Sequence, residues 1–115
     1  MADTAHKETA AKYVDREALR VELTRLREVW PQLRPKLEKQ VIPVVRLKQM
    51  LREAGCPCEP EQIGISVERL KRSYWQALFI RRRFTVLDLG QRAGLLEGAL
   101  EKLFGPGGCW SRNSV

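Results

Sequence analysis

The sequence predicts an all-α protein, a small bundle of about five to six helices with loose termini. Three observations predict it: apolar residues recur at spacings of three and four, capping residues precede several of these stretches, and no stretch alternates polar and apolar residues between hairpin turns. The 115 residues suit one domain. We expect a flexible N-terminal tail over residues 1–13, a helical domain over 14–104 and a flexible C-terminal tail over 105–115.

The first half of the chain holds three predicted helices separated by prolines. Asp15 can cap the first helix, which has an apolar stripe and an outer basic face. The stripe consists of Leu19, Leu23, Leu26 and Trp30, and the outer face of Arg16, Arg20, Arg25 and Arg27. Pro31 and Pro35 suit a first helical turn, so "PQLRPKLEKQVI" is predicted to be a second helix. Pro43 begins or kinks the third, which Gly55 ends in a left-handed conformation.

The second half begins with a loop, "GCPCEPEQIG", in which prolines and glycines leave room for one helical turn over residues 60–63. Ser66 is a good N-cap for the next helix, "VERLKRSYWQALFIRRRF", which is predicted to continue to Phe84. Thr85 and Asp88 have the spacing of a capping box, which begins a short helix that Gly94 stops. The apolar pattern then continues to "FGPGG".

Histidines, cysteines and hydropathy limit the chemistry that the chain can carry. The only histidine, His6, lies in the polar N-terminal stretch, and the Cys-Pro-Cys spacing of Cys56 and Cys58 is too short for a usual zinc site with Cys109. The sequence therefore predicts no catalytic, cofactor-binding or metal-binding residue, and three reduced thiols. With no signal peptide and no apolar run long enough for a bilayer, the chain is expected to be cytoplasmic and without a membrane partner.

The basic segment from Ser66 to Arg83 is the strongest candidate for binding. The chain carries a net charge of +7, which favours anionic partners. Against Glu68 alone, this segment holds Arg69, Lys71, Arg72, Arg81, Arg82 and Arg83. The following "TVLDLGQRAGL" overlaps with a helix-turn-helix pattern. Two interpretations stay open: a surface that binds an anion such as a nucleic acid, and a solvated face with ion pairs.

A series of short motifs lies between Ala54 and Leu96: Ala54-Gly55-Cys56-Pro57, Pro60 to Ile65, Ser73-Tyr74, Ile80 to Leu89 and Gly94 to Leu96. Together these motifs resemble the C-terminal helical region of the sn-glycerol-1-phosphate dehydrogenase family. The family is a branch of the iron-containing alcohol dehydrogenase and dehydroquinate synthase-like superfamily. The resemblance implies NAD(P)-dependent interconversion of dihydroxyacetone phosphate and glycerol 1-phosphate, with a divalent metal held by an aspartate and two histidines.

The cofactor loop and metal ligands of that family cannot be mapped onto this chain. NAD(P) and a divalent metal are therefore implied only for a complete family member, and this chain is expected to be the terminal helical portion, inactive alone, with a structural or subunit-packing role. Its expected partner is the missing N-terminal half of the dehydrogenase or a second copy of the chain. The residues expected at the packing interface are Trp30, Tyr74, Trp75 and Phe79.

Arg81 is the arginine that the resemblance makes a candidate phosphate contact, because a guanidinium binds phosphate bidentately. In a helix continuing to Phe84, Arg81 shares a stripe with Leu70 and Tyr74 and is expected to be partly buried, whereas Arg82 and Arg83 face solvent or Asp88. The alternative function is a small basic helical module that binds nucleic acid or another protein. Steep salt dependence of binding would distinguish the nucleic-acid interpretation.

Overall fold

The computed structural model describes residues 2–111, which form six α-helices and one short 3-10 helix and contain no strand. In chain order these are α1 (Ala2–Ala10), α2 (Arg16–Gln40), α3 (Val44–Glu53), η1 (Pro60–Ile63), α4 (Val67–Ala77), α5 (Val86–Arg92) and α6 (Leu96–Phe104). The predicted all-α class is confirmed. The single helical turn predicted at residues 60–63 is η1.

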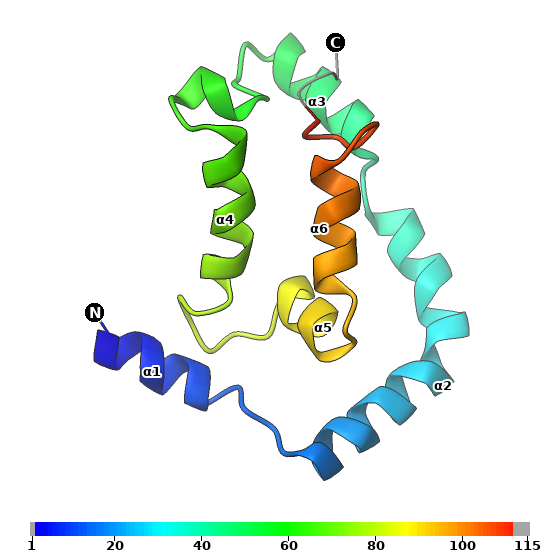
Figure 1. Cartoon of the computed structure of the whole chain (residues 1–115). Helices are drawn as coiled ribbons and strands as arrows, with labels where there is room; N and C mark the ends of the chain where they lie inside the picture. The colour runs from blue at the N-terminus through cyan, green and yellow to red at the C-terminus, as the bar shows by residue number, and fades with distance from the viewer. Residues whose placement is uncertain (1, 112–115) are drawn as a thin grey trace.

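A small core lies where α4, α5 and α6 meet. Figure 1 shows α4 and α6 side by side, with α5 at one end of the pair. The buried residues of this core are Leu78, Leu96 and Leu100, and the partly buried residues around them are Tyr74, Trp75, Leu87, Leu103 and Phe104. The rings of Tyr74 and Phe104 pack edge to face, with 5.7 Å between their centroids. So few buried apolar side chains provide only a modest driving force for folding.

α2 is one continuous helix, so the separate helix predicted to begin at Pro31 is wrong. It begins as predicted, because the Asp15 carboxylate accepts a hydrogen bond from the Ala18 N–H at 2.8 Å. Pro31 and Pro35 have no N–H to donate to the preceding turn. The helix bends, as Figure 1 shows. The bend is tolerated because no residue of Arg16–Gln40 is buried, so no tightly packed neighbour opposes it.

α4 ends at Ala77, so the prediction that it continues to Phe84 is wrong. Ser66 caps its N-terminus as predicted, with the Arg69 N–H donating to Ser66 Oγ at 3.1 Å. At its C-terminus, Lys12 donates to the carbonyl of Leu78, and Glu8 accepts the backbone N–H of Arg82. These side chains bind backbone groups that a longer helix would use itself, and they come from the other end of the chain.

A buried carboxylate, Asp88, joins α5 to the N-terminal segment. The backbone N–H and the hydroxyl of Thr85 both donate to Asp88 Oδ2 at 2.8 Å, which confirms the predicted capping box. Lys12 Nζ donates to the other oxygen at 2.6 Å. The side chains of Lys12 and Asp88 are only 11% and 8% exposed. Burial raises the pKa of Asp88, but the hydrogen bonds from Lys12 and Thr85 outweigh burial and hold that pKa below its ordinary value.

Both ends of the described chain contact the rest of the fold. Residues 2–10 are helical, and Arg92 donates to the backbone carbonyl of Lys12 at 2.6 Å. After α6, residues 105–111 fold back, with the Trp110 N–H bonded to Leu103 O at 3.0 Å and the Trp110 ring 4.4 Å from Lys48 Nζ. Residues 112–115 of the predicted C-terminal tail lie outside the described residues. The domain boundaries at residues 13 and 104 stay predictions.

The chain is open for its mass. Its accessible surface is 9586 Å², whereas a compact monomer of 13.3 kDa exposes about 6,500 Å². Its radius of gyration is 16.7 Å, against about 13 Å for a compact domain of this length. The exposed large apolar side chains include Tyr13, Val21, Trp30, Val41, Ile42, Val45, Ile63, Phe79, Ile80, Phe84, Val86 and Leu95. Much apolar surface is therefore left for another molecule to cover.

We expect Asp88→Ala to lower the free energy of unfolding by about 3 kcal/mol, since it removes the capping box and leaves the buried Lys12 ammonium without its carboxylate. The measurement is urea unfolding followed by circular dichroism. Glu38→Ala is the control, because it removes an exposed ion pair with Arg34 and should change stability far less than Asp88→Ala does. Equal losses in the two variants would show that Asp88 does not anchor the fold.

Acid should weaken the fold through the same carboxylate. Because the pKa of Asp88 is lower in the folded chain than in the unfolded chain, its contribution is complete above the unfolded value and is lost as pH falls through the folded value. We expect the free energy of unfolding to decline as pH falls below about 5, and the decline to continue until the folded carboxyl is protonated. Asp88→Asn, measured over the same range by urea unfolding, should show a shallower decline, and an unchanged slope would contradict this assignment.

Candidate interaction surface

An apolar groove runs along one side of α2, opposite α5. One part has a volume of about 450 Å³ and is lined by Leu23, Leu26, Arg27, Trp30, Pro31, Val86, Leu89, Gly90, Ala93 and Leu95. A second part continues toward the start of α2 and is lined by Arg16, Leu19, Arg20, Leu23, Thr24, Arg27, Ala93 and Leu95. The two parts share four residues, so they form one surface, which we call the α2–α5 groove.

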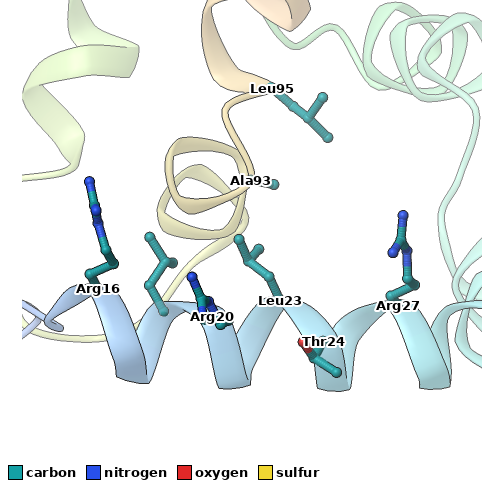
Figure 2. Close-up of a pocket in the computed structure, with 8 residues that line it drawn as sticks. Arg16, Arg20, Leu23, Thr24, Arg27, Ala93 and Leu95 are labelled. Carbon is teal, nitrogen blue, oxygen red and sulfur yellow. The ribbon is translucent and has the colours of Figure 1, made fainter.

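Local sequence features build both walls of the α2–α5 groove. The apolar stripe predicted for α2 recurs at three and four residues and therefore occupies one face of the helix. On the other wall, the capping box begins α5, and Gly94 (φ 67°) turns the chain in a left-handed conformation that favours glycine. Figure 2 shows Leu23 pointing from α2 toward Ala93 and Leu95 across the opening.

The apolar residues of the groove are only partly covered. Leu19, Leu23 and Leu26 are half-buried, whereas Trp30 is 41% exposed and Leu95 is 66% exposed. The predicted stripe of α2 therefore does not pack into a closed core. Covering a leucine fully contributes about 1.5–3 kcal/mol, so these side chains favour binding of another apolar surface.

Arginines border the groove on one side. At about 100° per residue, Arg16, Arg20 and Arg27 fall within an arc of about 40°, directly beside Leu23. Figure 2 shows Arg16 and Arg27 projecting from α2 toward the opening. None of the three arginines makes an ion pair with any residue between 2 and 111, and no carboxylate is among the described residues that line the groove. The border therefore carries uncompensated positive charge.

Other arginines of this region are paired, which makes the three border arginines distinct. Arg25 lies 3.7 Å from a Glu28 carboxylate oxygen, Arg34 donates to Glu38 at 2.8 Å, and Arg92 bonds Glu22. The sequence places Arg16, Arg20 and Arg27 on the outer face of the first helix, which is wrong: they flank its apolar stripe. A helical projection of residues 16–31 could have found this border, because its arginines cluster on one edge of the stripe.

The predicted basic segment does not form one helical face. Arg69, Lys71 and Arg72 are exposed on α4, whereas Arg81, Arg82 and Arg83 follow that helix in a loop. Arg81 is exposed, so its predicted partial burial is wrong, because α4 ends before the stripe reaches it. Arg82 pairs with Glu8 at 3.3 Å and not with Asp88, whose carboxylate is occupied by Lys12.

The four aromatic residues expected at a packing interface have different surroundings. Tyr74 and Trp75 pack against the small core, and Tyr74 Oη accepts a hydrogen bond from Trp110 Nε1 at 3.3 Å. Trp30 lines the α2–α5 groove, and Phe79 is 48% exposed after the end of α4. Only Trp30 lies on the groove.

No group of residues suited to a metal ion lies within the described part of the chain: residues 2–111 contain no cluster of three or more histidine, cysteine, aspartate or glutamate side chains. Cys56, Cys58 and Cys109 are not joined by disulfides. None of the helices between residues 2 and 111 combines the length and the apolar character needed to cross a bilayer.

Comparison with known proteins adds no relative. No family model matches the sequence, and no characterised protein or solved structure is significantly similar to it.

Proposed function

We propose that this chain is the helical C-terminal portion of an NAD(P)-dependent dehydrogenase resembling the sn-glycerol-1-phosphate dehydrogenase family. It is inactive alone and packs, through the α2–α5 groove, on a separate polypeptide that carries the cofactor and metal sites. The observation that carries the proposal is an apolar groove open to solvent along α2, a 25-residue helix without a buried residue.

The amount of exposed surface supports a packing role. The chain exposes about 3,000 Å² more than a compact monomer of its mass, whereas each partner of a standard protein interface buries about 800 Å². A large uncovered apolar surface is typical of a protein interaction site. Association with another polypeptide would cover it.

The motifs that suggest the dehydrogenase family have structural roles here. Gly55, Gly64 and Gly94 adopt φ values of 70°, 75° and 67° at the ends of α3, η1 and α5, and Thr85 and Asp88 form the capping box of α5. These residues determine where helices begin and end, which suits a packing role. We place this assembly in the cytoplasm.

A small basic module that binds nucleic acid is the second candidate, favoured by the net charge of +7 and the unpaired arginines of the groove. The apolar lining of the groove favours a protein partner instead. A phosphate backbone has no apolar surface that could cover Leu23, Leu89 and Ala93. The dehydrogenase packing role is therefore the main proposal.

Complementation tests the main proposal. The chain is mixed with the dinucleotide-binding N-terminal half of an sn-glycerol-1-phosphate dehydrogenase truncated before its C-terminal helices, in the presence of a divalent metal. We expect neither part alone to reduce NAD(P)+ with glycerol 1-phosphate and the mixture to do so, measured by absorbance of NAD(P)H. Leu95→Glu, which puts a charge on the exposed wall of the groove, should abolish the gain. No activity and no complex in the mixture would refute the proposal.

The resemblance makes Arg81 the candidate contact for a phosphate-bearing substrate in such an assembly, and Arg81 is exposed and has no ion pair with residues 2–111. In the complemented enzyme, Arg81→Ala should raise the Michaelis constant for glycerol 1-phosphate about tenfold, the loss of one charge-assisted hydrogen bond. Arg82→Ala is the matched control, since Arg82 pairs with Glu8. Unchanged constants for Arg81→Ala would remove it from the substrate site.

A further inference from the structure

The α2–α5 groove combines two recognition features that point to one kind of occupant. Its floor is apolar and made of leucine, alanine and tryptophan side chains from α2, from α5 and from the turn after α5, and its α2 border carries three arginines without carboxylate partners. An apolar floor alone would accept many surfaces. The one-sided positive border adds a requirement for negative charge along one edge of whatever covers the floor.

The dimensions of the groove suit a helix. Its α2 wall extends from Arg16 to Pro31, which at 1.5 Å per residue is about 22 Å, or four turns of an α-helix. Arg16 and Arg27 are about 16 Å apart along the axis. Acidic residues on one edge of a docked helix, spaced three or four apart, would therefore meet the border arginines along most of its length.

We infer that the α2–α5 groove binds an amphipathic α-helix whose apolar face is bordered on one edge by aspartate or glutamate. The helix belongs to the partner polypeptide, so this inference rests on the proposed function and names the partner's docking element. Its apolar residues, recurring at three and four positions, cover Leu23, Leu89 and Leu95, and its carboxylates pair with Arg16, Arg20 and Arg27.

Charge argues against a second copy as the occupant. The chain carries +7, and symmetric packing of α2 on α2 would bring the same three unpaired arginines of each copy close together. Like charges at an interface disfavour association. An acidic helix instead removes the uncompensated charge of the border while it covers the floor.

The probe is a labelled amphipathic peptide of about 18 residues, with leucines at i, i+3, i+4 and i+7 spacing and glutamates along one edge. A comparison peptide has lysine in place of every glutamate and the same leucines. Binding to the full chain is measured by fluorescence anisotropy at physiological ionic strength. We expect the acidic peptide to bind at least about tenfold more tightly than the basic peptide, the sum of three modest ion pairs.

Two charge-matched variants locate the binding. Arg16, Arg20 and Arg27 are replaced together by glutamine in one, and Arg69, Lys71 and Arg72 in the other, so both lose three positive charges. The first should weaken binding of the acidic peptide about tenfold and the second less than about twofold, because α4 contributes nothing to the groove. Leu95→Glu should weaken binding of both peptides, and circular dichroism verifies that each variant keeps its helices.

Several results would overturn the inference. Equal weakening by the two triple variants would indicate attraction to the positive charge of the whole chain. Equal affinity for the two peptides would show that the groove does not require acidic residues in the helix that it binds. Self-association in sedimentation that Leu95→Glu abolishes would make a second copy the occupant. In a further contrary result, duplex DNA displaces the peptide from the unaltered chain but fails to bind the variant lacking Arg16, Arg20 and Arg27. That result would make the surface a nucleic-acid site.

The outcomes also separate this inference from the proposed function. Binding of the acidic peptide does not depend on dehydrogenase activity, so peptide binding without complementation would refute only the dehydrogenase role. Complementation by the triple variant of Arg16, Arg20 and Arg27 at the level of the unaltered chain would refute only the acidic helix.

Discussion

The buried contact between Lys12 and Asp88 is the interaction on which the arrangement of the helices depends. The Lys12 ammonium group also donates to the Leu78 carbonyl at the end of α4, and the Asp88 carboxylate caps α5 through Thr85. One ion pair thus joins the segment after α1, the end of α4 and the start of α5. Removing either partner would leave a charge in a site too buried to hydrate it, which is why such a pair is costly to break even though it need not add much stability when intact.

Fixing α5 in this way creates a wall that the rest of the chain does not cover. α2 passes opposite α5 without burying any of its own residues, so its apolar stripe ends in the α2–α5 groove and not in a core. A second ionic junction, in which Lys48 bonds Glu59 at 2.9 Å and the Cys109 carbonyl at 2.8 Å, holds α3 to the C-terminal turn. Polar junctions therefore organise a chain whose buried apolar core is too small to do so.

Features set by neighbouring residues could be predicted from the sequence, and features set by distant residues could not. The caps at Asp15, Ser66 and Thr85 act within one turn, so their spacing alone predicts them correctly. The end of α4 depends on Glu8 and Lys12, more than sixty residues away in the chain. No local pattern contains that information. Because α4 ends early, Arg81 and Arg82 lie in a loop and not on the predicted helix.

The sequence predicts the apolar face of α2 but not the groove that this face lines, for a similar reason. The periodicity of α2 gives its apolar face, but periodicity cannot tell whether that face meets a core or an opening. The charges decide what the opening can accept: burying Leu23 beside three unpaired arginines under a neutral surface would strip water from the guanidinium groups without compensation. A partner that supplies carboxylates at that border avoids this desolvation penalty, so the same residues that attract an acidic helix also exclude a purely apolar one.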